Sequence, residues 1–323
     1  MHLHLHSEYS LLDGACRISD IPQRALECGH DAVAITDHGV MYGAVAFYNA
    51  CKKQSIKPII GCEVYVSAES RFAKSGSQLN RYNHLVLLCK DEQGYKNLIC
   101  LVSKGFTEGF YSKPRVDMAL LREHSEGLIA LSGCLAGKIP RALSKGDRAG
   151  ARTAALELRD IFGQENFFIE LQNHGLPEQL QILPELVSLA EECNIPMVAT
   201  NDCHYLRRRD ANAQATLMCI QTNSVITDGR PIGFEGDEYY YKTTDEMRML
   251  FGKYSGALEN TVKIAERCNF DFCFDKIFLP KYPCKRGTLP TELLSQMART
   301  GLERRVASGD IEYHNDEKTY LDR

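Results

Sequence analysis

The feature that most constrains the fold of this chain is the alternation of short apolar runs with longer segments of helical spacing. Short runs rich in Ile, Val and Leu predict strands at residues 2–6, 32–36, 58–66, 84–89, 128–132, 167–171 and 197–200. Apolar residues recur at helical spacing in residues 21–28, 42–54, 92–104, 147–162 and 177–193. Such alternation predicts parallel βαβ units, and about seven of them favour a closed βα barrel over an open sheet.

Beyond residue 205 the alternation stops and helical spacing dominates. Residues 210–221, 244–251, 257–268 and 289–306 are the predicted helices of an appended C-terminal helical region. The run LPKYPCKRGTLP at residues 279–290 is rich in turn-forming and helix-breaking residues, which predicts a linker. We therefore expect a barrel domain with its helical extension in residues 1–280, and a linker leading into a further region in residues 281–323.

The bulk composition narrows the class of protein. Apolar residues make up 44% of the 323 residues and charged residues 25%, as in globular domains. A net charge of −4 argues against a broad basic face for nucleic acid, so a phosphate-bearing ligand would be held locally. The 13 cysteines are odd in number and lack repeated zinc-finger spacing, so we expect most to be reduced and buried. The sequence has neither a membrane-length apolar stretch nor a signal-peptide core, so we expect a cytoplasmic protein without a membrane partner.

His4 and His6 form an alternating pair at the start of the chain. Alternate residues of a strand share a face, so the two imidazoles would project into one space and could bind a metal. The pair alone is a weak signal in a chain with 10 histidines. His2 shares that face but lies at the end of the strand away from the barrel mouth, which favours a packed or hydrogen-bonded histidine there.

Metal-binding side chains also mark most of the other predicted strands. They lie in the segments TDHG (36–39), GCE (61–63), SGC (132–134) and NDCH (201–204), and at His84 in the fourth strand. The carboxyl ends of barrel strands converge on one mouth, which is where active sites form. Imidazole, carboxylate and thiolate ligands together suit Zn²⁺, Mn²⁺ or Fe²⁺ better than Ca²⁺ or Mg²⁺. Adjacent ions need a bridging carboxylate, for which Glu63 is the candidate.

These residues lie in the motifs HLHLHSEYSLLDG, AITDHG, PIIGCEVYV, NHLVLL, LSGCLAG and ATNDCHYL. Together the motifs resemble the polymerase and histidinol phosphatase (PHP) superfamily, and more closely the branch that forms the N-terminal domain of bacterial DNA polymerase III alpha subunits. The stretches YNHLVLLCKDEQGYKNL, FYSKPRVD and FLPKYP are typical of the same branch. The resemblance implies a distorted seven-stranded βα barrel of the TIM-like kind. It also implies that residues 281–323 lead into a polymerase region whose palm lies outside this chain.

The resemblance further implies up to three divalent transition metals (Zn, Mn or Fe) held by nine residues. One metal would be bound by His4, His6, Glu63 and Asp202, a second by Glu63, His84 and Cys134, and a third by Asp13, His38 and His204. Inactive members of the superfamily have lost some of these ligands. Because all nine positions here hold a residue able to bind metal, we expect an intact site.

The reaction implied by the resemblance is hydrolysis of a phosphoester by metal-activated hydroxide, with Glu63, His84 and Asp202 as catalytic residues. In the polymerase branch this is 3′ to 5′ exonuclease cleavage of DNA. Candidate contacts to substrate phosphates are Lys113, Arg115 and the run of three arginines that begins at Arg207. The implied partners are a DNA 3′ end or another phosphoester, the rest of the polymerase III alpha chain, and the other holoenzyme subunits.

Some of these residues also have simpler interpretations. Cys134 could be a small buried residue, Asp13 a turn residue in LLDG, and Arg207 part of a solvated charge run. Asp37 could orient the neighbouring imidazole or cap a helix. Glu170 near the end of the sixth predicted strand, and Asn173 and His174 just after it, could line the mouth, but no ligand position of the superfamily matches them.

Three functions compete at this point. The first is an active metal-dependent 3′ to 5′ exonuclease or phosphoesterase domain. The second is a non-catalytic domain whose metals stabilise the polymerase and help to dock a proofreading subunit. The third is a stand-alone small-molecule phosphatase of the same superfamily, against which the stretches FYSKPRVD and FLPKYP argue.

Overall fold

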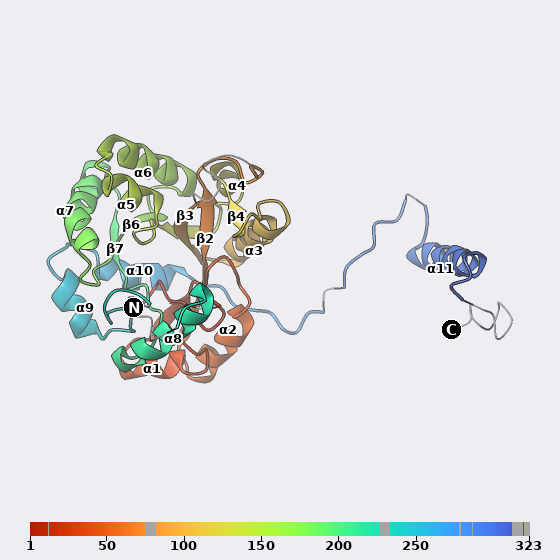
Figure 1. Ribbon diagram of the computed structural model, residues 1–323, viewed down its shortest axis with the longest axis horizontal. Coiled ribbons are helices and arrows are strands. Elements are labelled where there is room, and N and C mark those ends of the chain that lie inside the picture. Colours follow the sequence, from red (N-terminus) through yellow and green to blue (C-terminus); the bar gives the residue numbers. More distant parts are fainter. Residues whose placement is uncertain are drawn as a thin grey trace. The chain divides into compact units, whose positions relative to one another are not determined.

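A computed structural model describes residues 1–11, 13–74, 82–225, 233–277, 279–285, 287–311 and 319 of the chain (Figure 1). The chain divides into two compact units, Met1–Phe272 and Cys273–Arg323. The domain boundary expected near residue 280 lies inside the second unit. In that unit the structure describes helix α11 (Pro290–Ala307), which agrees with the helix predicted at residues 289–306.

The first unit is built on a seven-stranded sheet, and six of its strands lie where the sequence predicts them. The strands are β1 (Ala32–Ile35), β2 (Lys57–Ser67), β3 (Tyr82–Cys89), β4 (Arg115–Val116), β5 (Leu128–Leu131), β6 (Phe167–Leu171) and β7 (Met197–Ala199). The two-residue strand β4 was not predicted.

Helices follow or cover these strands. Those between the strands are α1 (Ile21–Glu27), α2 (Ala44–Lys53), α3 (Glu92–Thr107), α4 (Met118–Glu123), α5 (Lys138–Leu143), α6 (Arg148–Phe162) and α7 (Pro177–Glu192). The short helices α4 and α5 were not predicted. After β7 come the 3-10 turn Arg208–Asp210 and the helices α8 (Ala211–Thr222), α9 (Thr244–Phe251) and α10 (Glu259–Arg267), which confirm the appended helical region.

The N-terminal segment closes the sheet into a barrel. The strand order is β1-β2-β3-β5-β6-β7, with β4 paired to β2. Parallel bridges join His2 to Val33 of β1 and Leu5 to Cys203, just after β7, so the segment fills the gap between the two outer strands. The predicted barrel is therefore confirmed, although the segment predicted as a strand at residues 2–6 consists of isolated bridges.

One strand runs against the predicted parallel direction. β3 pairs antiparallel with both β2 and β5, whereas β1–β2, β5–β6 and β6–β7 are parallel. A parallel pair needs a crossover, usually a helix, but the polar stretch ESRFAKSGSQLNR between β2 and β3 has no helical periodicity. The chain therefore returns as a hairpin. His84 reaches the barrel mouth from the beginning of β3 and not from its carboxyl end.

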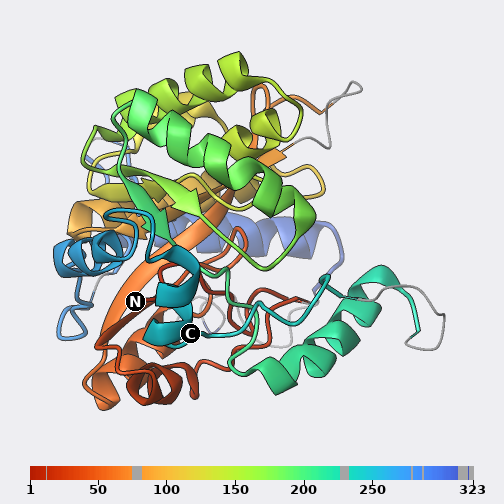
Figure 2. The same cartoon turned by 90° about the vertical axis from the view of Figure 1, so that its left-hand side faces the viewer.

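Apolar side chains pack on both faces of the sheet. Inside the barrel, Leu3, Val86, Ile129 and Phe168 form a buried cluster that includes Ile264 of α10. Outside it, a larger core joins the other strand face to the surrounding helices. Figure 2 shows α6 and α7 (green) lying together over one side, with the long strand β2 (orange) crossing behind them. The barrel is thus a packed core, and space for polar side chains is left at its mouth.

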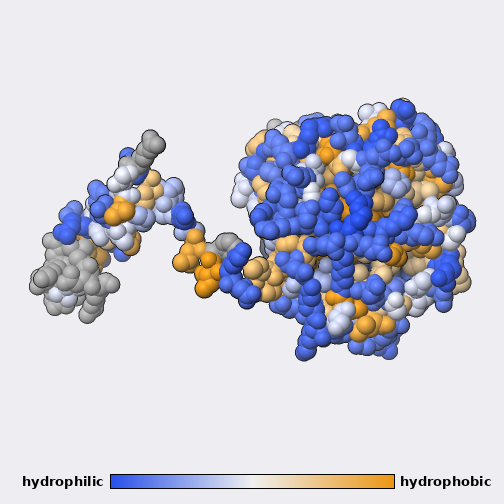
Figure 3. Space-filling model, turned by 180° about the vertical axis from the view of Figure 1, so that it is seen from behind, coloured by the Kyte–Doolittle hydropathy of each residue, from blue (hydrophilic) through white to orange (hydrophobic). Residues whose placement is uncertain are grey.

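The helical extension completes the first unit. Thr243 caps α9 by accepting from the backbone of Glu246, whose carboxylate bonds back to Thr243, and α10 packs against β7. Hydrophilic side chains cover most of the face of this unit seen in Figure 3, interrupted by hydrophobic patches. Among the described helices, none combines the length and apolarity that crossing a membrane requires.

Candidate metal centre

The inward face of the barrel changes from apolar to polar toward the mouth. Side chains alternate across a strand, so Ile59 and Glu63 of β2 share a face, as do Val86 and His84 of β3. At the mouth the structure brings together the nine residues predicted as ligands. They are His4, His6, Asp13, His38, Glu63, His84, Cys134, Asp202 and His204.

His4, His6 and Asp202 form one tight group of donors. The Nε2 atoms of the two histidines lie 3.1 Å apart. Oδ1 of Asp202 lies 3.3 Å from Nε2 of His4 and 3.0 Å from Nε2 of His6. Both histidines are fully buried, and Asp202 is 7% exposed. Asp202 adopts a left-handed backbone with φ of 43°, which is uncommon outside glycine and marks a position held by its surroundings.

Glu63 occupies the middle of the cluster and is fully buried. Its Oε1 lies 2.9 Å from Nδ1 of His84 and 3.4 Å from Nε2 of His4. Its Oε2 lies 2.5 Å from Nδ1 of His38 and 3.9 Å from Nε2 of His6. One carboxylate thus faces four imidazoles, which is the position that a bridging ligand needs.

Three groups of side chains have the geometry to hold a metal ion. They are His4, His6 and Asp202; His38, Glu63 and His84; and His6, His38 and His204. Within each group, the atoms that could bind the metal all lie within 4.8 Å of one another. Asp13 joins this cluster through its Oδ2, 3.1 Å from Nε2 of His38. Cys134 is more distant, with Sγ 3.7 Å from Nδ1 of His84 and 4.0 Å from Oε1 of Glu63.

Five buried polar atoms of this cluster form no hydrogen bond of acceptable geometry with the residues that the structure describes, although several of them lie close to one another. They are Oδ1 of Asp13, Nδ1 of His38, Oε2 of Glu63, Oδ1 of Asp202 and Nε2 of His204. Buried polar groups in proteins are nearly always satisfied, so five exceptions in one place need an explanation. Nitrogen and carboxylate oxygen atoms facing one space fit divalent cations of the borderline transition-metal type.

A model of the PHP domain family matches residues 2–174, more than half of the chain. The chain belongs to the PHP domain family. It is 46% identical over 283 residues to the DNA polymerase III subunit alpha of Treponema pallidum (strain Nichols), which covers 87% of this chain and 24% of that protein. It is 44% identical over 315 residues to the subunit of the same name from Thermus aquaticus, covering 94% of this chain and 26% of that protein. The chain spans about a quarter of the length of these relatives.

Among solved structures, the PHP domain is similar to an amidohydrolase from Chromobacterium violaceum. The two share 15% sequence identity with a TM-score of 0.42, over 63% of this chain and 87% of that one.

The electrostatics of the PHP centre keep its acids ionised. Burial alone would raise the pKa of Glu63, but the imidazoles of His84 and His38 hold that pKa well below its usual range. Burial would likewise raise the pKa of Asp202, but His4 and His204 hold that pKa well below its usual range. Both carboxylates are therefore charged at neutral pH and able to bind cations.

Two other groups of the centre differ in their protonation. Burial, together with the neighbouring imidazoles of His38 and His204, lowers the pKa of His6 to about 3, so its ring is neutral at neutral pH and one ring nitrogen carries no proton. Burial beside Glu63 raises the pKa of the Cys134 thiol well above its usual value. A cation bound at Cys134 would therefore have to displace a proton.

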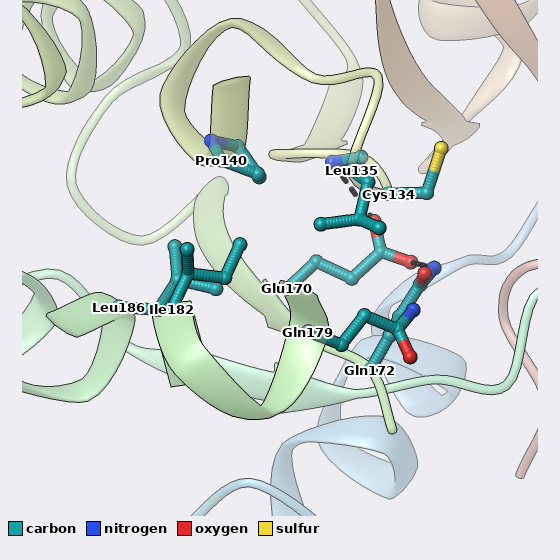
Figure 4. Close-up of a pocket in the computed structure, with 9 residues that line it drawn as sticks. Cys134, Leu135, Pro140, Glu170, Gln172, Gln179, Ile182 and Leu186 are labelled. Carbon is teal, nitrogen blue, oxygen red and sulfur yellow. Dashed lines mark hydrogen bonds between the residues drawn. The ribbon is translucent and has the colours of Figure 1, made fainter. Parts of the chain in front are cut away.

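Glu170 is a functional residue that sequence reasoning left out. Its Oε1 lies 2.7 Å from Nδ1 of His4, and its Oε2 accepts from the backbone N–H of Gly133 at 2.9 Å. Gly133 has φ of 82°, and a side chain there would meet the carbonyl of His84. Figure 4 shows Glu170 reaching toward the loop that carries Cys134. Glu170 thus fixes the ring of His4 with Nε2 directed into the centre.

A second buried acid supports His6. The carboxylate of Asp37 accepts from Oγ of Ser10 at 2.7 Å and from the backbone N–H and Oγ of Ser7. Oγ of Ser10 in turn lies 3.2 Å from Nδ1 of His6. Of the two roles open to Asp37, the structure favours orientation of an imidazole, but of His6 through Ser10 and not of the neighbouring His38.

The predicted phosphate contacts lie in three different environments. Arg115 is 1% exposed, and its guanidinium donates to the backbone carbonyls of Gly109, Arg71 and Ala73, so it is committed to the fold and its prediction as a substrate contact is wrong. The guanidinium of Arg207 forms an ion pair with Glu27. The ammonium of Lys113 lies 5.4 Å from the ring centre of Tyr65.

Tyr65 connects Lys113 to the centre, because its ring lies 5.3 Å from that of His84 and 6.1 Å from that of His38.

Proposed function

We propose that this PHP domain is a metal-dependent phosphoesterase that hydrolyses phosphodiesters at DNA 3′ ends. The observation that carries the proposal is the set of five buried polar atoms around Glu63 that crowd together at the barrel mouth without hydrogen bonds of acceptable geometry among the described residues. Buried polar atoms without a hydrogen bond destabilise a fold unless a bound ligand, such as a metal ion, interacts with them. The similarity to DNA polymerase III alpha subunits supports DNA as the substrate.

The nine residues at the mouth would hold up to three divalent ions. His4, His6, Glu63 and Asp202 would bind one, Glu63, His84 and Cys134 a second, and Asp13, His38 and His204 a third. Such ions would supply Lewis acidity toward the phosphate and a nucleophile from water at neutral pH.

The chain's own residues prepare the centre for this chemistry. Glu63 and Asp202 hold negative charge in a buried space, so they would attract and bind divalent cations. Glu170 and the Asp37–Ser10 pair fix the tautomer and direction of His4 and His6. We assign catalytic roles to Glu63, His84 and Asp202, because these side chains face the space where the phosphate would be bound.

Digestion of a 3′-labelled single-stranded DNA in Mn²⁺ tests this proposal. The parent should release labelled nucleotide, and His84→Ala should slow release by at least about 100-fold, since loss of a ligand should cost no less than loss of an outer partner. His124→Ala is the matched control, because His124 lies at the end of α4 and contacts Cys100 and Asn97. Equal release by the parent and His84→Ala would contradict the assignment of the site.

A second candidate function is a non-catalytic domain that its metals stabilise. The observation that favours it is the spread of the donors along the chain, from His4 to His204, so bound ions would cross-link the whole barrel. In that case metal would raise the melting temperature of the parent while labelled DNA and bis(p-nitrophenyl) phosphate both stay intact.

A further inference from the structure

We propose that the outer part of the β2–β3 hairpin is a subsite for single-stranded nucleic acid, formed by Tyr82, Tyr65, Lys113 and Arg141. This inference rests on the proposed function, because it names the form of substrate that the metal centre would receive. It also replaces the predicted contact Arg115, which is buried in the fold.

The register of the hairpin places this subsite next to the centre. Glu63 lies opposite Val86, Tyr65 opposite His84, and Ser67 opposite Tyr82. Directly opposite residues of an antiparallel pair point to the same side of the sheet. Tyr82 therefore lies on the face of His84, two residues farther from the centre, which is roughly 7 Å along the strand.

Aromatic rings continue outward along this face. The ring of Tyr82 is parallel to that of His84, with an interplanar angle of 5° and centres 6.1 Å apart. Tyr65 is buried, at 4% exposure, and meets Tyr82 edge to face at 4.9 Å, so it supports the ring of Tyr82 and does not itself offer a stacking face. Tyr82 is half-buried, so part of its side chain remains accessible. Base stacking on such rings is tolerant of sequence, because every base has a π face.

Two cations flank these rings. The ammonium of Lys113 lies by the ring of Tyr65, and the guanidinium of Arg141 donates to the backbone carbonyl of Tyr82 at 2.8 Å and to Oδ1 of Asn83 at 3.2 Å. Within the described part of the chain, neither cation forms an ion pair with a carboxylate. Cations whose charge is not neutralised by an acid remain available to phosphates.

The combination favours a single strand over a duplex. Stacking needs an exposed base face, whereas the bases of a duplex already stack on one another. A strand with its scissile phosphate at His84 would place the neighbouring nucleotide against Tyr82 and its phosphates near Arg141 and Lys113. The subsite would therefore position the strand for cleavage.

Fluorescence anisotropy with a labelled phosphorothioate oligothymidylate of about 12 nucleotides, in Mn²⁺, tests this subsite. Phosphorothioate linkages resist hydrolysis, so binding is measured with the metals present. Tyr82→Ala should weaken binding about tenfold and leave its salt dependence unchanged, whereas Tyr82→Phe should bind like the parent. Arg141→Ala should weaken binding and reduce the slope of log affinity against log salt by about 0.7, the value for one lost phosphate contact.

Lys263→Ala, which removes an exposed lysine from α10, is the charge-matched control and should bind like the parent. Unchanged affinity in both Tyr82→Ala and Arg141→Ala, or tighter binding of a duplex of the same length, would overturn the subsite. Hydrolysis of bis(p-nitrophenyl) phosphate reports on the centre alone and should be the same in the parent and in Lys263→Ala. If the parent fails to hydrolyse this diester while the binding pattern holds, the proposed function fails and the subsite stands.

Discussion

Two clusters of buried histidines lie in the first unit, and they differ in how their nitrogens are satisfied. In the cluster of His2 and His30, His2 bonds to the carbonyl of Lys242 and contacts Sγ of Cys203, while His30 bonds to the hydroxyls of Tyr241 and Thr244.

At the barrel mouth, in contrast, Nδ1 of His38 and Nε2 of His204 form no hydrogen bond of acceptable geometry with the described residues, and neither does one oxygen each of Glu63 and Asp202, although these atoms lie close together. The difference teaches that a buried histidine is not by itself a site. What distinguishes a ligand-binding centre from packed histidines is a group of buried polar atoms that face a common space without satisfactory hydrogen bonds.

The largest effect that sharpens this contrast is expected from Glu63→Gln. The substitution removes the charge that faces four imidazoles, so metal content should fall and phosphodiester hydrolysis should drop by more than about 100-fold. Elemental analysis and a bis(p-nitrophenyl) phosphate assay would measure both. A variant that keeps the parent's metals and rate would show that Glu63 is not the shared ligand.

A smaller effect is expected from Glu170→Gln, because Glu170 acts on the centre indirectly, through Nδ1 of His4 and the backbone N–H of Gly133. Losing the carboxylate that orients the imidazole should weaken metal binding by about 10- to 100-fold while keeping hydrolysis at saturating metal. Titration of the metal-free protein with Mn²⁺, followed by activity, would measure this shift. Unchanged affinity would mean that Glu170 serves packing alone.

The satisfied cluster predicts a pH effect on stability. Burial, with help from the N-terminal amine and Arg24, lowers the pKa of His30 to about 4. Since the unfolded imidazole titrates near 6.5, the stability that the neutral ring provides is complete above that pH and is lost as pH falls toward 4.

Chemical denaturation between pH 4.5 and 7 should be run in parallel for the parent and His30→Gln. Between these pH values the free energy of unfolding should fall by about 1 to 2 kcal/mol less in His30→Gln than in the parent. Identical pH profiles for parent and variant would contradict the role of His30.

The smallest effect on the centre is expected from His2→Gln, in the satisfied cluster. This substitution leaves the unpartnered donors in place, so metal content and hydrolysis should match those of the parent. Loss of its hydrogen bond to Lys242 should lower the free energy of unfolding by about 1 kcal/mol. Loss of metal in this variant would break the distinction between the two clusters.

Much of the fold follows from local pattern. The strands and long helices lie near their predicted positions because period-2 and helical spacing of apolar residues set which faces are buried. The direction of β3 does not follow from that pattern, because the same sequence of buried residues is compatible with parallel and with antiparallel pairing. The predicted seven-stranded barrel was correct, but its uniformly parallel sheet was wrong.

The centre was predictable for residues that share a motif and not for those that support it. The nine proposed ligands lie in recognisable sequence motifs, most of them at or near a predicted strand. Glu170 follows no such motif, and its role depends on β6 lying beside the ring of His4, which only the tertiary structure shows. Burial of Arg115 is likewise a tertiary property, because its guanidinium donates to the carbonyls of Arg71 and Ala73, which are 44 and 42 residues away in the sequence.

Metal content of the parent and Asp202→Asn, both prepared without chelator, tests the central claim most directly. Asp202 contributes Oδ1 to the group with His4 and His6, and this oxygen forms no hydrogen bond of acceptable geometry with the described residues. We predict up to three transition-metal ions in each parent chain, and fewer in the variant. A parent without transition metal, or a variant with the same metal content as the parent, would contradict the assignment of the barrel mouth as a metal centre.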